Sequence, residues 1–373
     1  MKIAVIATSS VPAATANSIQ VMKVCQALTE IGFTVHLWVP GTEQISWDQI
    51  ADYYGLRVPF EISWIPTPLT WRRYDFAWKA ISRAKTWGAD VIYTWMPQTA
   101  LFSLWRKIPV LNEIHMLPSG RIGPWLFRQF IKHPGKKRLI IITDALRRSL
   151  EQTYLVDFST QDFLIAPMGS EPERYTDLPD PPGARTQLGL PDKITVGYTG
   201  HFYRGRGMEV LLGLALAFPE VHFLWIGGHP QDKKYWQEHL LSSGIQNVSL
   251  TGFIPNSNLP LYQAAADILV MPYGRTISVS SGGNTADVCS PMKMFDYIAS
   301  GRAIITSDLP VLHEVLNTNN AVFCPPDDLA AWTAALGHLL SDETLRKQLS
   351  DQAKSDALKY TWRSRAKKSL SGF

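Results

Sequence analysis

The chain has 373 residues, of which 46% are hydrophobic and 18% charged, and its formal net charge is +4. These values are typical of a globular protein with room for two domains, and they exclude an intrinsically disordered chain. The three cysteines lie far apart without a CxxC pair, which argues against a disulfide framework or a zinc site. No run of about 18 uncharged apolar residues occurs, so we expect a cytoplasmic protein, at most peripheral to a membrane.

The basic excess lies in the first half of the chain. Residues 1–185 contain 20 Lys or Arg and 16 Asp or Glu, whereas residues 186–373 contain 16 of each kind. This surplus is too small for a nucleic-acid-binding protein, and no motif of that class accompanies it. It favours a phosphate-bearing small acceptor or an anionic membrane surface as partner.

Short apolar runs rich in β-branched residues alternate with helical patterns along the whole chain, which predicts parallel α/β sheets. The runs are 3–7, 34–39, 90–93, 109–112 and 139–142, followed by 194–198, 222–226, 248–250, 268–271 and 303–306. The proline-rich stretch 178–183 separates the two sets and is interpreted as a linker. We therefore predict two Rossmann-like domains, 1–180 and 186–356, with ligands in a cleft between them.

The loop after the first predicted strand is rich in hydroxyl and amide groups. It leads into a helix that presents Val21, Cys25 and Leu28 on one face, and Asn17 or Ser18 is the expected cap. Such groups at a helix N-terminus suit an anion, although a simple capping motif explains them equally well.

The segment 290–301 is the most informative one. Ser290 and Pro291 predict a helix start, and Gly301 predicts its end. Lys293 falls in the first turn, where its charge opposes the helix dipole, so we expect an anionic ligand to offset it. The alternative is an ordinary αβ unit with a solvated lysine.

This segment resembles the nucleotide-sugar site of retaining family-4 glycosyltransferases, which have the GT-B fold. Segments 196–207, 223–228 and 248–255 resemble further parts of that family in the right order. The resemblance implies two Rossmann-like domains, a last helix (357–373) that returns to the first domain, and a diphosphate held by Arg206 and Lys293. It implies donor contacts from Gly200, His201, Arg204, Gly228, Phe253, Ser290, Pro291, Met292 and, at the ribose, Asp296.

The chain departs from the family pattern at several of these positions. His201 stands where arginine is usual, and Arg204 is the expected compensation. Arg206 replaces the usual lysine and suits phosphate equally, because a guanidinium stays charged. Val288 stands where the first of two paired acids is usual, with Asp287 next to it, so the donor sugar stays open.

His115 follows a predicted strand and resembles the family's strand-end histidine, which lies beside the transferred sugar. A structural role is the alternative reading. Glu113 and Arg121 are the nearest charged residues in sequence, and either could orient His115 or contact the acceptor. Glu113 could equally be a buried partner of a basic residue.

The resemblance implies a retaining enzyme that transfers a hexose from a nucleotide diphosphate, UDP more than GDP, without a metal or other cofactor. The acceptor is either a sugar phosphate, as in members resembling sucrose-phosphate synthase, or a polysaccharide or lipid-linked sugar stacked on Trp71, Trp95 or Trp125. The expected acceptor residues are Ser10, Asn17, Ser18, Arg72, Arg73, Trp95 and Arg121. A GT-B epimerase and a non-catalytic sugar-nucleotide sensor are the alternative functions.

Overall fold

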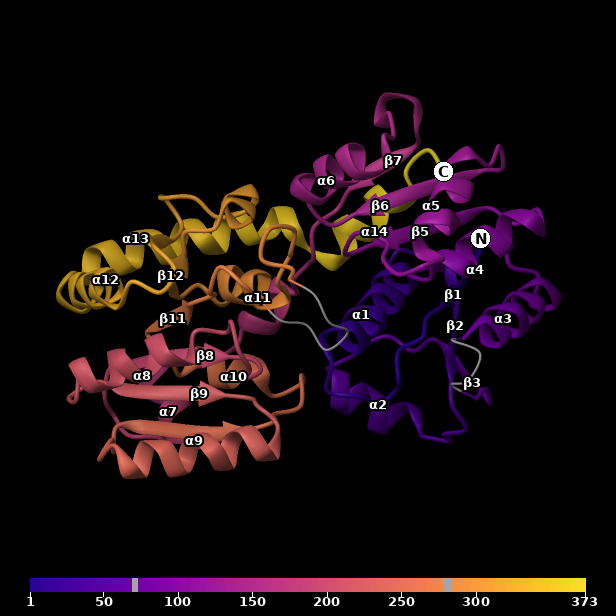
Figure 1. Ribbon diagram of the computed structural model, residues 1–373. Coiled ribbons are helices and arrows are strands. Elements are labelled where there is room, and N and C mark those ends of the chain that lie inside the picture. Colours follow the sequence, from indigo (N-terminus) through magenta and orange to yellow (C-terminus); the bar gives the residue numbers. More distant parts are fainter. Residues whose placement is uncertain (69–72, 278–283) are drawn as a thin grey trace. The chain divides into compact units, whose positions relative to one another are not determined.

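The computed structural model describes residues 1–68, 73–277 and 284–373. The chain divides into two compact units, one formed by Met1–Pro167 with Trp362–Phe373 and the other by Met168–Thr361. Each unit has a parallel sheet with helices on both faces, as Figure 1 shows. The predicted pair of Rossmann-like α/β folds is confirmed.

The boundaries between the units differ from the predicted ones. The chain enters the second unit at Met168 and returns to the first at Trp362. The proline-rich stretch is not a linker, because Pro181 begins helix α7 (Pro181–Leu188) within the second unit, and Asp180 caps it by accepting from the Gly183 amide. Proline is tolerated there because the backbone N–H groups of the first helical turn have no acceptor within the helix, so the N–H that proline lacks is not needed.

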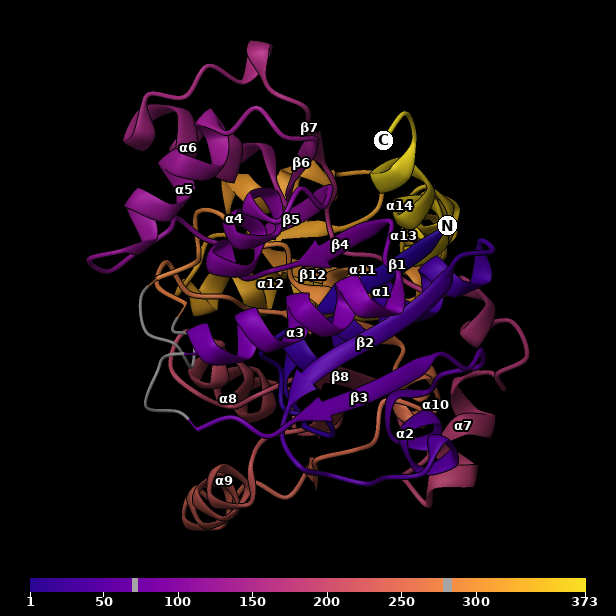
Figure 2. The same cartoon turned by 90° about the vertical axis from the view of Figure 1, so that its right-hand side faces the viewer.

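The first unit has a seven-stranded sheet in the order β3-β2-β1-β4-β5-β6-β7. Its strands are β1 (Lys2–Ile6), β2 (Thr34–Pro40), β3 (Glu61–Ile65), β4 (Val91–Thr94), β5 (Val110–Ile114), β6 (Lys137–Ile141) and β7 (Phe163–Ile165). Its helices are α1 (Ala16–Glu30), α2 (Trp47–Tyr54), α3 (Tyr74–Trp87), α4 (Pro97–Trp105), α5 (Gly123–Lys132), α6 (Asp144–Tyr154) and α14 (Trp362–Leu370). Helices α1 and α14 pack together on one face of the sheet, and α3 and α4 pack together on the other (Figures 1 and 2).

The second unit has a six-stranded sheet in the order β10-β9-β8-β11-β12-β13. Its strands are β8 (Thr195–Thr199), β9 (His222–Ile226), β10 (Val248–Gly252), β11 (Ile268–Met271), β12 (Ala303–Ser307) and β13 (Val322–Cys324). Besides α7, its helices are α8 (Met208–Ala217), α9 (Pro230–Ser242), α10 (Leu259–Ala264), α11 (Met292–Ser300), α12 (Leu329–Ser341) and α13 (Glu343–Ala357).

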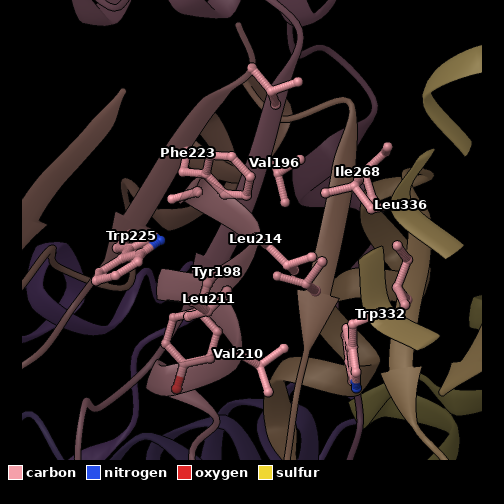
Figure 3. Close-up of a cluster of buried hydrophobic side chains, with 14 of the residues drawn as sticks. Val196, Tyr198, Val210, Leu211, Leu214, Phe223, Trp225, Ile268, Trp332 and Leu336 are labelled. Carbon is pink, nitrogen blue, oxygen red and sulfur yellow. The ribbon is translucent and has the colours of Figure 1, made fainter. Parts of the chain in front are cut away.

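The core of the second unit explains why α8 is apolar nearly all round. Figure 3 shows that its side chains, such as Leu214, meet those of the central strands, such as Phe223, and of α12, such as Trp332. Helix α8 is therefore covered on two sides, by the sheet and by α12. Gly213 permits the close approach, since a Cβ there would lie 2.5 Å from the Leu329 side chain.

No described helix is long and apolar enough to cross a bilayer. Within the same residues, no group of three or more His, Cys, Asp or Glu side chains is arranged to hold a metal ion.

Candidate active site

The second unit contains a lysine whose ammonium is buried without a counter-charge. Lys293 is the second residue of α11, and its Nζ has no hydrogen-bond partner among the described residues. The ammonium lies 3.9 Å from the ring centroid of Tyr198, at the end of β8, and 5.3 Å from that of Tyr273. Burial lowers the pKa of Lys293 well below its usual value, and the charge of Arg206 lowers it further. An anion is the ligand that this ammonium lacks.

Arg206 brings a second cation to the same place. It lies in the β8–α8 loop, and its guanidinium is 5.1 Å from the ring centroid of Tyr273 and 5.5 Å from that of Tyr203. The Arg206 Nε is buried without a partner in the described structure. Burial raises the pKa of Tyr273 to about 12, so its ring stays neutral beside both cations. The structure thus brings together the two predicted diphosphate cations, which are 87 positions apart in the printed sequence.

Two glycines make room for this arrangement. Gly200 has φ +137°, and a Cβ there would lie 2.7 Å from the Lys293 ammonium. Gly207 has φ +74° and is the N-cap residue of α8, where a Cβ would lie 1.8 Å from the carbonyl oxygen of Pro272. A side chain at Gly200 would displace the Lys293 ammonium, and a side chain at Gly207 would clash with the Pro272 backbone and displace the loop that carries Arg206.

His201 does not add a third cation. Its ring stacks on Tyr203 with centroids 4.9 Å apart and on His229 with centroids 4.8 Å apart. Burial, then the charges of His229, Arg206 and Lys293, lower the pKa of His201 to about 4. The imidazole is therefore neutral at pH 7, and Arg204, the expected compensation, is exposed to solvent.

The start of α11 differs from the prediction at Ser290. The cap residue is Pro291, which has an extended backbone and makes no side-chain cap, and Met292 begins the helix. Ser290 is buried, and its hydroxyl instead accepts from the backbone amide of Met168 at 3.1 Å. The predicted helix start at Ser290 and Pro291 is therefore one or two residues early, and the Ser290 hydroxyl bonds to the start of the second unit instead of capping α11. An uncapped N-terminus remains beside Lys293.

Three other predicted donor residues lie on α11 or just after strands β9 and β10. Asp296 lies one turn after Lys293 on α11 and is half-buried, and its charge contributes to the raised pKa of Tyr175. Gly228 follows β9 with φ +77°, and a Cβ there would meet the Phe202 ring at 2.5 Å. Phe253 follows β10, and 43% of it is exposed.

The first unit holds His115 in a buried network at the end of β5. The His115 Nε2 lies 2.7 Å from Oε1 of Glu113 and 3.1 Å from Nε2 of Gln20. The Glu113 side chain is completely buried, and its Oε1 also lies 2.7 Å from the Arg365 guanidinium on α14. The Tyr93 hydroxyl donates to the other carboxylate oxygen. The two roles considered for Glu113 therefore occur together: it orients His115 and pairs with a basic residue.

The charge of Glu113 is secured by its partners. Burial alone would raise the pKa of this carboxyl, but Arg365 and His115 lower it far below the usual range. The carboxylate accepts a hydrogen bond from Nε2 of His115, which places the imidazole proton on Nε2. In the neutral ring, Nδ1 is then an acceptor for a ligand hydroxyl.

The loop before α1 is held by its own hydroxyl groups. Thr15, not Asn17 or Ser18, caps α1, and its hydroxyl accepts from the Ser18 amide at 3.3 Å. Ser18 is fully buried and donates to the Ser10 carbonyl at 2.9 Å, so it fixes the loop and cannot present its hydroxyl to an acceptor. Asn17 is exposed and accepts from the Ser9 hydroxyl.

The remaining acceptor candidates are scattered through the first unit. Arg73 donates to the Thr67 carbonyl at 3.1 Å, and Arg121 is exposed in the β5–α5 connection. The Trp95 Nε1, just after β4, is buried without a partner in the described part of the chain. Arg72 and Trp71 lie outside the described residues.

Sequence reasoning missed the residues that support the Arg206–Lys293 pair and the residue that supports the His115 network. Tyr198 and Tyr273 resembled ordinary core residues, and Arg365 lies in a basic helix that has the pattern of a solvated surface. The sequence did contain one signal for such a partner. Glu113 lies inside the strand 110–114, and a buried charged acid must have a basic or hydrogen-bonding partner.

Two Rossmann-like units, one of which brings two cations together at a strand end and a helix start, are the architecture of the GT-B class of glycosyltransferases. A "Glycosyltransferase Family 4" model matches residues 18–160, and a "Glycosyl transferases group 1" model matches residues 193–342. Together these models account for more than three quarters of the chain. The protein belongs to family 4 of the glycosyltransferases, as the sequence resemblance implied.

Similar proteins agree with this assignment. D-inositol 3-phosphate glycosyltransferase of Corynebacterium urealyticum is 22% identical over 94% of this chain and 88% of its own length. Sucrose-phosphate synthase of Thermosynechococcus elongatus has 18% identity and a TM-score of 0.73, with 98% of this chain and 96% of that chain covered. Anabaena HepE, solved with UDP, has 14% identity and a TM-score of 0.76, with both chains covered completely.

Proposed function

We propose that this glycosyltransferase transfers a hexose from a UDP-sugar to a phosphate-bearing acceptor and releases UDP, with retention at the anomeric carbon and without a metal. One observation carries the proposal: Arg206 and Lys293, from different elements, meet at the Tyr273 ring, and the Lys293 ammonium has no partner in the described structure. A diphosphate matches this pair in charge and in having several acceptor oxygens.

The reaction step that this pair serves is departure of the nucleotide. The bond between C1 of the sugar and the β-phosphate oxygen breaks, and negative charge grows on the leaving diphosphate. Arg206, Lys293 and the uncapped start of α11 stabilise that charge, and one well-placed donor of this kind contributes about 3–4 kcal/mol. Because two cations already lie beside the Tyr273 ring, we propose that the reaction needs no divalent ion.

We propose retention because segment 290–301 resembles the site of retaining family members, and the lack of a carboxylate nucleophile among the residues assigned here favours a same-face displacement over a double displacement. His115 offers an imidazole nitrogen, and its partner Glu113 is fully buried and occupied by Arg365. We propose that the acceptor oxygen bonds to C1 on the face that the diphosphate leaves. The acceptor proton then passes to the departing phosphate oxygen, and Nδ1 of His115 accepts a hydrogen bond from the transferred sugar.

The choice of UDP and of the acceptor is supported by similarity. HepE, which has the same fold, was solved with UDP, so we favour UDP over GDP. The relative named for D-inositol 3-phosphate favours a phosphorylated small acceptor. Arg121, exposed on the loop that follows β5 and His115, is the cation that we assign to that phosphate. A polysaccharide or lipid-linked sugar near Trp95 is the competing acceptor.

A two-way screen tests the proposal. Several UDP- and GDP-sugars are combined with sugar phosphates, inositol phosphates, neutral oligosaccharides and lipid-linked sugars in chelator, and released nucleotide is measured. We expect turnover with a UDP-sugar and a phosphorylated acceptor, and NMR of the product should show the donor's anomeric configuration. An inverted product, or turnover with neutral acceptors alone, would contradict the corresponding part of the proposal.

A further inference from the structure

Three neighbouring helices of the first unit carry the exposed tryptophans of the described structure. Trp78 on α3 is 52% exposed, Trp105 at the end of α4 is 54% exposed, and Trp125 on α5 is 49% exposed. Helix α4 packs between α3 and α5 on one side of the sheet. Large rings gathered on one exposed face indicate a binding surface, because single exposed tryptophans are scattered when they serve no contact.

Two of these tryptophans form a contiguous group with a phenylalanine and an arginine, which we call the aromatic cluster: Trp78, Phe102, Trp105 and Arg106. The Phe102 and Trp105 rings stack with centroids 5.2 Å apart, and Trp78 meets Phe102 edge-on at 6.4 Å. The Arg106 guanidinium lies 3.9 Å from the ring centroid of Trp78. The cluster therefore places a cation directly on an exposed indole.

The chain around this cluster is strongly basic. Residues 97–133, which include α4 and α5, contain Arg106, Lys107, Arg121, Arg128 and Lys132 and a single acidic residue, Glu113, which is buried in the His115 network. Helix α3 adds the exposed Lys79 and Arg83 beside Trp78. Of the acids in and just after α3, Asp90 accepts a hydrogen bond from the backbone amide of Lys2 at 2.7 Å, and Asp75 is half-buried. Positive charge therefore dominates this face.

We propose that the α3–α5 face binds the surface of a bilayer that contains anionic phospholipid. Tryptophan favours the headgroup region, because its ring is apolar and its N–H is polar. Lysine and arginine beside it are attracted by lipid phosphates. Trp78 and Trp105 enter the interface, and Arg106, Lys79 and Arg83 contact headgroups. The contact is peripheral, since no described helix could span the bilayer.

Other occupants fit this face less well. A sugar stacks on a free ring face, but Arg106 covers one face of Trp78 and Phe102 covers one face of Trp105. A second copy of the chain would bring two basic surfaces together, and like charges oppose that association.

Vesicle sedimentation of the full chain tests the proposal. The probes are phosphatidylcholine vesicles with and without phosphatidylglycerol, at low and high salt. The variants are W78S/W105S and K79Q/R83Q. The matched controls are Y235S/L241S and K234Q/K347Q, which change similarly exposed residues of the second unit. Circular dichroism and UDP binding establish that each variant is folded.

We expect wild type and both controls to sediment with the anionic vesicles at low salt and not with neutral ones. W78S/W105S should lose at least tenfold in partitioning, and K79Q/R83Q should lose roughly fivefold for each charge removed. The proposal is overturned if wild type ignores anionic vesicles, or if the folded variants bind them as wild type does. It is also overturned if W78S/W105S binds anionic vesicles as wild type does but has lost binding to soluble glycans, or has lost self-association.

Discussion

Arg365 and Glu113 join the end of the chain to the middle of the first sheet: the guanidinium lies 2.7 Å from the carboxylate, and their side chains are 5% and 0% exposed. The same carboxylate oxygen holds Nε2 of His115 at 2.7 Å. Removing either partner of a buried ion pair costs about 3–5 kcal/mol, because the other charge is left uncompensated. The last helix therefore supports the orientation of the candidate catalytic histidine.

Replacing Glu113 should separate orientation from folding. E113Q keeps the size of the side chain but removes the charge that Arg365 requires, and it no longer fixes the proton of His115 on Nε2. We expect a fall in kcat of one to two orders of magnitude with the Michaelis constant for the donor little changed. Steady-state kinetics measure this, with E61Q, an exposed acid in the same sheet, as control. Unchanged kcat in folded E113Q would remove His115 from the reaction.

The stability of the first unit should depend on the charge of Glu113. Its folded pKa is depressed, so its stabilisation is fully present above the unfolded value near 4.3 and is lost as pH falls further toward the folded value. The protection factors of β5 and α14 amides, which correct each exchange rate for the intrinsic rate at that pH, should therefore fall on acidification below about pH 4 in wild type. E113Q should exchange faster already at pH 7 and show a weaker acid response. An equal acid response in both proteins would contradict the assigned ion pair.

UDP binding should be accompanied by proton uptake at Lys293. Burial lowers the pKa of the free ammonium, and a bound diphosphate would raise it again by supplying negative charge. Calorimetry at alkaline pH, in buffers with different ionisation enthalpies, should show proton uptake by wild type and none by K293M. K233M, a lysine of α9, is the control. Equal proton uptake by K293M and wild type would show that a group other than Lys293 takes up the proton when UDP binds.

Arg121 distinguishes the two acceptor classes. If its exposed guanidinium holds an acceptor phosphate, R121A should raise the Michaelis constant for phosphorylated acceptors by about tenfold and leave UDP binding unchanged. The effect should shrink at high salt, because the site is exposed. R128A, an exposed arginine on α5, is the matched control for activity on soluble acceptors. An equal effect of R121A on neutral and phosphorylated acceptors would favour the glycan alternative.

Much of the fold could be predicted because its central strands are short, fully buried apolar runs. The predicted runs correspond to β1, β2, β4–β6 and β8–β12. Three edge strands, β3, β7 and β13, were not predicted, because each is only three to five residues long and mostly half-buried, which is too little to identify a strand in the sequence. The domain boundaries were missed for another reason: two prolines at a helix start resemble a linker in sequence alone.

The candidate site was predictable where backbone and charge were specified by the sequence, as at Lys293 and Arg206. It was not predictable where a side chain depends on a distant partner. The Ser290 hydroxyl accepts a hydrogen bond from the Met168 amide and does not cap α11. The Glu113 carboxylate pairs with Arg365, which lies near the other end of the chain. Burial also cannot be predicted from the residue type. Ser18 has a hydroxyl that could bind a ligand, but its side chain has no exposed surface.

The central claim is that Arg206 and Lys293 stabilise the departing diphosphate without a metal, and R206A in chelator tests it most directly. Turnover of R206A should fall by roughly 10²–10³ with a smaller change in the Michaelis constant for the donor, whereas R204A, an exposed arginine of the same loop, should remain near wild type. R206K should recover part of the loss. The claim is contradicted if wild type requires Mn²⁺ or Mg²⁺, or if R206A turns over as fast as R204A.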